Sequence, residues 1–163
     1  MSVLYKTAVA AHSGDSVTKP LLYYKKYEDF LNHHKIAPKT ILEIGTYKGE
    51  STKILSKSFP HSKILSLDLD IKAIDFSSYP NITYKKADQT KQDQMVPLIK
   101  EHFPDGIDLV IEDASHLGFF SKLTFEIVFP YLKSCGAYFI EDWGTGYYDH
   151  WLDGSKFQDF SQL

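Results

Sequence analysis

The stretch that decides the fold is Thr40-Ile41-Leu42-Glu43-Ile44-Gly45-Thr46-Tyr47-Lys48-Gly49-Glu50. A short apolar run ends at one glycine, and a helical pattern begins after a second glycine. This order predicts a buried strand, a tight turn and a helix N-terminus. Gly45 has no Cβ, so it can take positive φ and let a ligand approach its backbone. Glu43 can reach the crevice where open α/β sheets bind ligands. The alternative is an ordinary βα turn that happens to use glycines.

Size and composition are those of one soluble globular domain spanning residues 1–163. The chain is 43% hydrophobic and 24% charged, with a formal net charge of −3. Nothing in this charge favours nucleic acid or an anionic membrane surface as a partner. The single cysteine, Cys135, excludes an intramolecular disulfide and a multi-cysteine zinc site. Because the sequence shows neither a signal peptide nor a long apolar span, we expect a cytoplasmic protein.

The first 35 residues are predicted to form an N-terminal arm followed by one helix. Residues 1–19 show little apolar periodicity and are interpreted as an arm or loop. A helix is expected to open at Lys19-Pro20, because proline is favoured at the first helical position, and to end near His33-His34. Residues 36–142 then form the core, and residues 143–163 form a tail.

From residue 40 onward, strand and helix patterns alternate. Strands are expected at 41–44, 64–67, 82–86, 107–111 and 137–140, and helices at 50–59, 71–76, 91–103 and 118–132. Alternation of this kind predicts parallel strands joined by right-handed crossovers. The fold class is therefore α/β: a Rossmann-like, doubly wound parallel sheet of five strands in the order 3-2-1-4-5.

Acidic residues gather at the predicted strand ends. They are Glu43, Asp68, Asp70, Asp88, Asp113, Glu141 and Asp142. The carboxyl ends of parallel strands lie on one edge of the sheet, where ligands bind. A ring of carboxylates repels itself unless a cationic cofactor, a metal ion or hydrogen-bond donors such as ribose hydroxyls lie there. Each acid taken separately is also explained as a helix N-cap.

The turn after the first strand also limits the choice of cofactor. A dinucleotide site favours G-x-G-x-x-G, but Tyr47 stands at the second glycine position. The E-x-G-x-x-x-G pattern instead resembles motif I of the class I methyltransferases that use S-adenosylmethionine, a cofactor with a cationic sulfonium. The resemblance implies that the cofactor contacts Glu43, Gly45, Thr46, Gly49, Asp68 for the ribose with Asp70 as its alternate, Asp88 and Gln89 for the adenine, and Asp113.

Two later segments resemble a narrower group, the metal-dependent sugar O-methyltransferases that act on macrolides and related glycosides. Residues 110–116, VIEDASH, resemble that group's VIDDGSH, and residues 138–147, YFIEDWGTGY, resemble its YVIEDxxTxYW. This resemblance implies that Asp113, Glu141 and Asp142 bind a divalent cation, with Mg²⁺ favoured by an all-oxygen set. It also implies that His116 is the general base for a hydroxyl whose pKa the metal lowers. A helix-start residue that contacts its own loop is the alternative for His116.

The sequence departs from the family pattern in several places, among them Glu112 in place of the first Asp of VIDDGSH. Ala114 replaces the glycine of D-G-S-H, and only about twenty residues follow Asp142, without the runs for a sixth and seventh strand. An open fifth strand would be an aggregation-prone edge. We therefore expect the aromatic tail (Tyr147, Tyr148, Trp151, Phe157 and Phe160) or a second subunit to cover it.

Three functions remain open at this level. The first is Mg-assisted O-methylation of a hydroxylated, sugar-containing small molecule with S-adenosylmethionine as donor. The second is a cofactor-binding but inactive interaction module. The third, a nucleotide-linked oxidoreductase, is disfavoured because G-x-G-x-x-G is absent.

Overall fold

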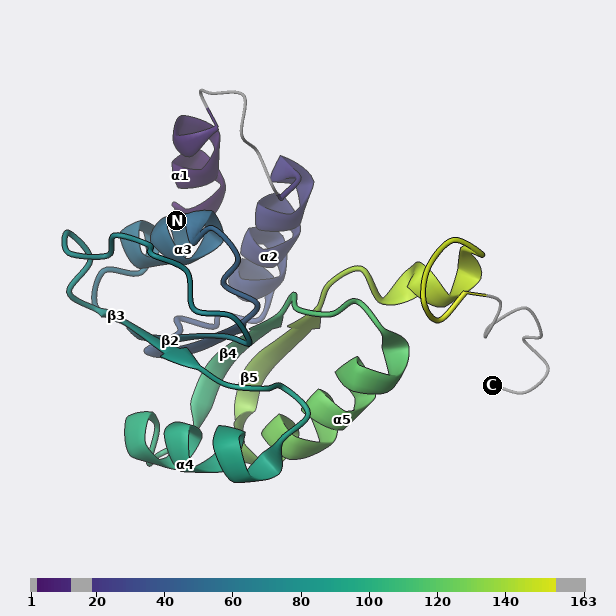
Figure 1. Ribbon diagram of the computed structural model, residues 1–163. Coiled ribbons are helices and arrows are strands. Elements are labelled where there is room, and N and C mark those ends of the chain that lie inside the picture. The colour runs from purple at the N-terminus through teal and green to yellow at the C-terminus, as the bar shows by residue number, and fades with distance from the viewer. Residues whose placement is uncertain (1–2, 13–18, 155–163) are drawn as a thin grey trace.

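The fold is a five-stranded parallel sheet, seen in a computed structural model that describes residues 3–12 and 19–154 (Figure 1). The strands are β1 (Thr40–Ile44), β2 (Lys63–Asp68), β3 (Ile82–Lys86), β4 (Ile107–Glu112) and β5 (Leu132–Ile140). Their order in the sheet is β3-β2-β1-β4-β5, and every pairing is parallel. The predicted Rossmann-like topology is confirmed. No helix in the described ranges is long and apolar enough to cross a membrane.

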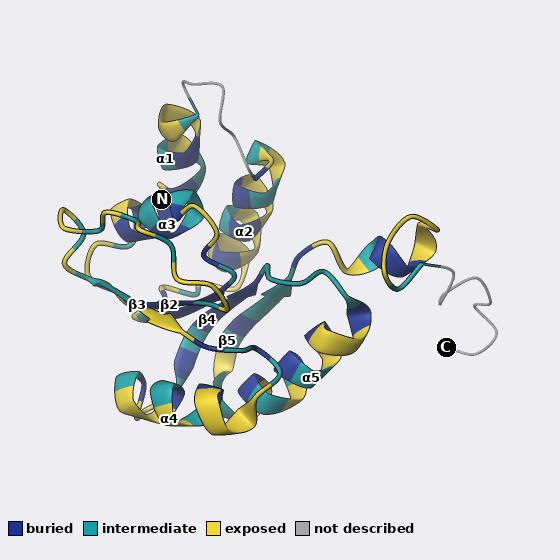
Figure 2. Cartoon of the chain, viewed as in Figure 1, coloured by how far each residue is buried: buried dark blue, intermediate teal, exposed yellow. Residues whose placement is uncertain are grey.

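Helices cover both faces of this sheet (Figure 1). One face carries α1 (Leu4–Ala11), α2 (Leu21–His33) and α3 (Glu50–Ser58), and the other carries α4 (Gln92–His102) and α5 (Gly118–Val128). Ile41 packs with the first group, whereas its neighbour Leu42 packs with the second. Side chains of a strand alternate between faces, so a strand covered on both sides is apolar throughout. This is why β1, β2 and β4 are buried along most of their length, whereas the edge strands β3 and β5 are more exposed (Figure 2).

The N-terminal segment is helical, which corrects the prediction of an arm or loop over residues 1–19. Leu4 and Ala8 stand four residues apart, and both are fully buried where α1 packs on α2 and α3. Only these two side chains of α1 are buried, so the sequence pattern was too short to reveal the helix. The Ser13-Gly14-Asp15-Ser16 stretch lies outside the described residues.

The segment after β2 is irregular, so the helix predicted at residues 71–76 is wrong. Its apolar residues Ile74 and Phe76 pack beside Gly49, in the turn before α3, and do not form one face of a helix. A Cβ built on Gly49 would lie 2.8 Å from Phe76 Cζ and 2.9 Å from Ile74 Cγ2. The ring of Phe76 also meets that of Tyr84 edge-on, at a centroid distance of 5.6 Å.

The last helix is shorter than expected and the last strand longer. α5 ends at Val128, the 3₁₀ turn η1 (Phe129–Tyr131) follows, and β5 begins at Leu132 instead of Ala137. Pro130 has no N–H to donate to a continuing α-helix. Leu132 then pairs with Ile107, with an irregular register before Leu109. Cys135 is an exposed residue of this strand.

The described part of the tail does not cover the open edge of β5. The 3₁₀ helix η2 (Trp143–Tyr147) packs against α5, and the chain beyond it projects away from the sheet (Figure 1). Tyr147, Tyr148 and Trp151 are exposed. The predicted cover by these three residues is therefore wrong. Phe157 and Phe160 lie outside the described residues, and cover by a second subunit stays a prediction.

Candidate functional site

Two adjoining pockets open at the carboxyl edge of the sheet. The first has a volume of about 500 Å³ and lies over the ends of β1, β2 and β3. The second, of about 440 Å³, lies between the β1 turn, the start of α2 and the ends of β4 and β5. Both are lined by Gly45, Tyr47, Asp113 and Ala114. Pockets of this size hold small molecules or cofactors, and the shared wall would bring two bound molecules into contact.

Gly45 is required by the packing of the chain itself. Its φ is +99°, and its N–H donates to the Leu67 carbonyl oxygen at 2.8 Å. A Cβ there would lie 2.0 Å from the backbone oxygen of Asp113. Gly45 therefore lets the loop after β4 cross the β1 turn, and so fixes where Asp113 lies between the two pockets. The space left by its missing side chain is filled by the chain itself, and the contact of Gly45 with a cofactor stays a prediction.

Gly49 and Glu43 are not among the residues that line these two pockets, and their contact with a cofactor stays a prediction. Gly49 takes φ +75° before α3, and Phe76 fills the space beside it. Glu43 shares the face of Ile41 and is fully buried; its Oε2 accepts hydrogen bonds from Thr52 at 2.5 Å and Ser66 at 2.8 Å. Burial raises the pKa of the Glu43 carboxyl. Its position ties β1, β2 and α3 together beneath the site.

Thr46 occupies the turn between the two glycines. It is buried, its hydroxyl lies 2.7 Å from that of Ser66, and it lines the second pocket. It therefore belongs to both the supporting polar network and the pocket wall.

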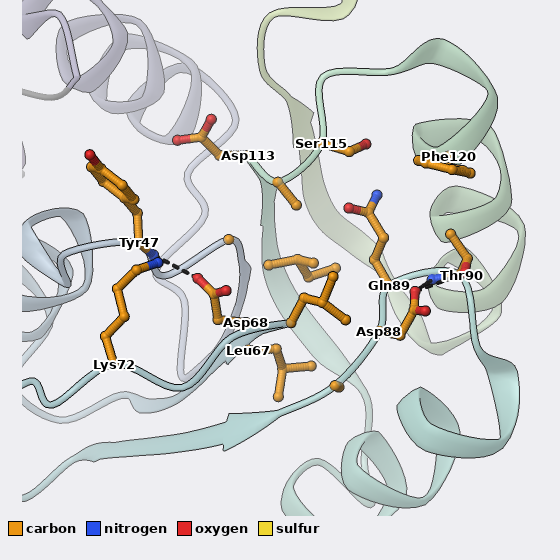
Figure 3. Close-up of a pocket in the computed structure, with 15 residues that line it drawn as sticks. Tyr47, Leu67, Asp68, Lys72, Asp88, Gln89, Thr90, Asp113, Ser115 and Phe120 are labelled. Carbon is orange, nitrogen blue, oxygen red and sulfur yellow. Dashed lines mark hydrogen bonds between the residues drawn. The ribbon is translucent and has the colours of Figure 1, made fainter. Parts of the chain in front are cut away.

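Asp68, unlike Asp70, lies in the first pocket (Figure 3). Its Oδ2 accepts a hydrogen bond from the Tyr47 N–H at 2.8 Å, and its Oδ1 accepts one from the Asp70 N–H at 3.0 Å. These bonds hold the carboxylate at the end of β2, and each oxygen keeps acceptor capacity for a ligand. Asp70 is exposed and contributes its backbone to this arrangement.

The opposite wall of the first pocket carries Asp88 and Gln89 (Figure 3). Asp88 Oδ1 accepts bonds from the Thr90 N–H at 2.9 Å and hydroxyl at 2.8 Å, which hold the pKa of Asp88 below its usual range. The Gln89 amide donates to Thr124 at 2.8 Å and to the buried Glu112 at 3.1 Å. The apolar wall is completed by Leu67, Leu69, Ala87 and Phe120. An apolar slot with polar groups at both ends suits a nucleoside.

Asp113, His116 and Asp142 converge in the second pocket. One ligand atom from each lies within 4.8 Å of the others, a spacing compatible with a shared metal ion. His116 Nδ1 lies 3.8 Å from Asp113 Oδ1 and 4.0 Å from Asp142 Oδ2. His116 and Asp142 both take positive φ, +59° and +52°. Such φ values in non-glycine residues are uncommon and are found at functional sites.

His116 Nδ1 is buried and makes no hydrogen bond within the described chain. A buried polar atom without a partner is costly unless a ligand supplies one. The backbone around this histidine is held by the tail, because the Thr145 hydroxyl donates to the His116 carbonyl oxygen. Asp153 in turn accepts from Thr145 at 3.0 Å and from the Gly118 N–H at 3.0 Å. The tail therefore fixes the loop between β4 and α5.

Glu141 has a different environment from the other two predicted metal ligands. It is buried, its Oε1 lies 2.5 Å from Lys19 Nζ, and it also accepts a hydrogen bond from the Tyr27 hydroxyl. Burial raises the pKa of the Glu141 carboxyl to about 7, although the Lys19 charge opposes this. Burial would lower the pKa of Lys19, but Glu141 and Asp113 together raise it, so Lys19 carries its charge.

Asp142 is also bonded from α2. The Tyr23 hydroxyl donates to Asp142 Oδ1 at 2.5 Å, and this bond raises the pKa of Tyr23 to about 12. Sequence reasoning did not place Lys19, Tyr23 or Tyr27 in the site. Their spacing of four residues is the signal in the sequence that could have grouped them.

A divalent cation fits the second pocket in part. Asp113 Oδ1, Asp142 Oδ2 and His116 Nδ1 lie within 4.8 Å of one another, and two of them are the oxygen ligands that Mg²⁺ prefers. Glu141 Oε1 already accepts two hydrogen bonds. The pocket thus offers a ligand set whose third carboxylate is engaged by α2.

Comparisons with known proteins agree with this fold and these motifs. No protein-family model matches the chain. Mycinamicin VI 2''-O-methyltransferase of Micromonospora griseorubida is 28% identical over 134 residues, covering 77% of this chain and 31% of that protein. L-olivosyl-oleandolide 3-O-methyltransferase of Streptomyces antibioticus is 30% identical over 118 residues, covering 66% of this chain and 29% of that protein.

Solved structures show the same architecture. MycE methyltransferase from the mycinamycin biosynthetic pathway, in complex with Mg, SAH and mycinamycin VI, superposes with a TM-score of 0.72 at 24% identity. The match covers 89% of this chain and 40% of that one. The resemblance to class I methyltransferases, and within them to macrolide sugar O-methyltransferases, is thereby confirmed. The chain spans about a third of the length of these curated relatives.

Proposed function

We propose that this chain contains the cofactor-binding and reaction centre of an S-adenosylmethionine-dependent O-methyltransferase whose acceptor is a hydroxyl on a sugar-containing small molecule. The observation that carries this proposal is the pair of pockets that share Gly45 and Asp113. One pocket suits a nucleoside, and the other holds acids and a histidine. The named activities of the relatives support the same chemistry.

The first pocket would bind the nucleoside part of the cofactor. Asp68 would accept hydrogen bonds from the ribose hydroxyls, because both its oxygens are fixed by backbone N–H groups and keep acceptor capacity. Asp88 and Gln89, with the apolar wall, would hold the adenine. The cofactor supplies an electrophilic methyl group on a cationic sulfonium, and the carboxylate of Asp113 would favour that charge nearby.

The second pocket would hold the acceptor. Asp113, Glu141 and Asp142 would bind Mg²⁺, which supplies a Lewis acid that lowers the pKa of a hydroxyl. His116 would take the hydroxyl proton as the oxygen attacks the methyl group. The loop that presents His116 is held by Thr145 and Asp153, so the ring is positioned before an acceptor arrives. Position counts, because a general base must lie within hydrogen-bond reach of the proton that it removes.

The pairing of Asp68 with Asp70 gives a matched test of cofactor binding. Asp68→Asn should weaken the binding of S-adenosylhomocysteine, measured by calorimetry, by roughly 10-fold or more, because a charged acceptor becomes a neutral amide. Asp70→Asn, in the exposed neighbour, should leave the affinity nearly unchanged. If Asp68→Asn and the unsubstituted protein bound S-adenosylhomocysteine with equal affinity, the proposal that the cofactor binds in this pocket would be wrong.

His116 gives the corresponding test of chemistry. His116→Asn should keep the affinity for S-adenosylhomocysteine and reduce methyl transfer to a glycosidic acceptor by about 100-fold or more. Transfer at the unsubstituted rate would show that His116 is not the base.

A second function, a cofactor-binding interaction module without catalysis, is favoured by one observation. Lys19 and Tyr27 both donate hydrogen bonds to Glu141 Oε1, so this carboxylate oxygen is already engaged and the proposed set of metal ligands is incomplete. Such a module would bind S-adenosylhomocysteine with the same affinity in the presence and absence of Mg²⁺, and it would transfer no methyl group.

A further inference from the structure

Lys19 lies between two of the carboxylates that the proposed function gives to a metal ion. Its side chain is only 6% exposed, although it belongs to the segment just before α2. Nζ lies 3.0 Å from Asp113 Oδ2 at the end of β4 and 2.5 Å from Glu141 Oε1 at the end of β5. A cation of the protein itself therefore holds together the ends of two neighbouring strands.

Lys19 is the first of three donors spaced four residues apart. Tyr23 donates to Asp142, and Tyr27 donates to Glu141. Tyr23 and Tyr27 lie one turn apart on the same side of α2, and Lys19 lies in the segment just before that helix, so the three donors together face the three proposed metal ligands. Each of these carboxylates accepts a bond from these donors.

A bound Mg²⁺ and the Lys19 ammonium cannot share these oxygens. Magnesium needs its ligand oxygens about 2.0–2.1 Å away in an octahedron, and Glu141 Oε1 already accepts from both Lys19 and Tyr27. Two cations on one carboxylate pair would also repel each other strongly in a buried site.

We propose that Lys19 is a built-in competitor for the divalent cation: its ammonium holds Asp113 and Glu141 in the metal-free chain and withdraws when an ion binds Asp113, Glu141 and Asp142 together. The inference rests on the proposed function for its ligand set. It adds a metal-coupled movement of the segment before α2, which lines the acceptor pocket through Lys19 and Pro20, next to Tyr23 of α2. Metal binding and the opening of that wall are then one event.

Removal of the competitor is the first test. Mn²⁺ binding is measured by electron paramagnetic resonance on the full chain, for the unsubstituted protein, Lys19→Met and Lys25→Met. Lys25 is the matched control, because it lies on α2 and pairs with Asp29 in an exposed position. Lys19→Met should bind Mn²⁺ roughly 10-fold tighter or more, as expected when a negatively coupled ligand is removed. Lys25→Met should bind Mn²⁺ as the unsubstituted protein does.

A second measurement needs no variant, so it tests the withdrawal of Lys19 even if Lys19→Met does not fold. The unsubstituted chain is acetylated with a limiting amine reagent with and without saturating MgCl₂, and each lysine is followed by peptide mass spectrometry. Lys19 should be protected without Mg²⁺ and several-fold more reactive with it. Lys25 should react equally in both.

Several results would overturn the inference. Equal or weaker Mn²⁺ binding by a folded Lys19→Met would show that Lys19 does not compete, or that it orients the ligands. Protection of Lys19 in saturating Mg²⁺ would show that it stays in place. Calorimetry with S-adenosylhomocysteine on the same samples separates this failure from that of the proposed function, because cofactor binding would persist in the first case and be lost in the second. Absence of Mn²⁺ binding in every variant would overturn both the competition and the proposed metal site.

Discussion

Replacing Gly45 by alanine should disturb the site more than any change to a charged residue around it. The new Cβ would lie 2.0 Å from Asp113 O, 2.5 Å from Asp113 C and 2.9 Å from Ala114 Cα, and all three are backbone atoms that no rotamer change can move. The left-handed φ of +99° adds a conformational cost of about 1–2 kcal/mol, and forcing an extra methyl into a packed region adds about 1–3 kcal/mol.

Together these terms predict a loss of about 2–5 kcal/mol in the free energy of unfolding, a large part of the ~5–15 kcal/mol typical of a domain. Urea denaturation measures the loss, and calorimetry with S-adenosylhomocysteine should show weakened binding because Asp113 is displaced. Gly144→Ala is the control, since a Cβ there meets only Tyr147 Cδ2 at 3.8 Å, an ordinary contact. If Gly45→Ala and Gly144→Ala were equally stable, the close crossing of the two loops would be refuted.

Three further changes test the supports of the fold and of the site. Asp108 accepts hydrogen bonds from the Lys39 N–H at 2.8 Å and from Lys133 Nζ at 2.9 Å. Burial alone would raise the pKa of Asp108, but these donors hold it below its ordinary value. The stability that Asp108 contributes is thus present above pH ~4 and lost as pH falls through its lowered pKa, so Asp108→Asn should cost roughly 1–3 kcal/mol at pH 7 and less at pH 3, measured by urea denaturation. Thr145→Val should lower the free energy of unfolding by about 1 kcal/mol, measured by thermal denaturation. It should also speed amide hydrogen exchange in the His116 loop. Leu65→Ala, in the fully buried β2, should cost about 2–5 kcal/mol in urea.

Each of these three changes has its own contradiction. An Asp108→Asn penalty that is the same at pH 3 and pH 7 would exclude the lowered pKa. Thr7→Val removes an exposed hydrogen bond from the Thr7 hydroxyl to the Val3 carbonyl oxygen and is the control for Thr145→Val. If amide hydrogen exchange in the His116 loop were equal in the two variants, the tail would not support that loop. Leu152→Ala, at an 89% exposed position, is the control for Leu65→Ala and should be nearly neutral; an equally small loss for Leu65→Ala would contradict its burial in the core.

The core of the fold could be predicted from the sequence because the physics there is local and repetitive. The apolar run before Gly45 and the run before Asp113 are buried on both faces, as continuous β-branched strands require. Alternation with helices then leaves few topologies. The errors arose where tertiary packing prevails over pattern. Helix α1 is held by Leu4 and Ala8 alone, and residues 71–76 pack across Gly49 instead of coiling.

The site was predicted in part for the same reason. Asp68, Asp88 and Asp113 follow strands, so the sheet brings them to one edge. Glu43 lies one residue before the strand end, and the alternation of the strand turns it into the helix layer beside Thr52. Lys19 is separated from Glu141 by 122 residues, and no spacing rule joins a helix start to the last strand end.

The central claim, that two adjoining pockets hold a nucleoside cofactor and a cation-assisted reaction centre, is tested most directly by a crystal structure of the chain with S-adenosylhomocysteine and Mn²⁺. We expect ribose density at Asp68, adenine density between Asp88 and Phe120, and an anomalous Mn²⁺ peak at Asp113 and Asp142 with Lys19 Nζ displaced from Glu141. Density for the nucleoside outside the first pocket, or an anomalous peak away from these carboxylates at saturating Mn²⁺, would contradict the claim.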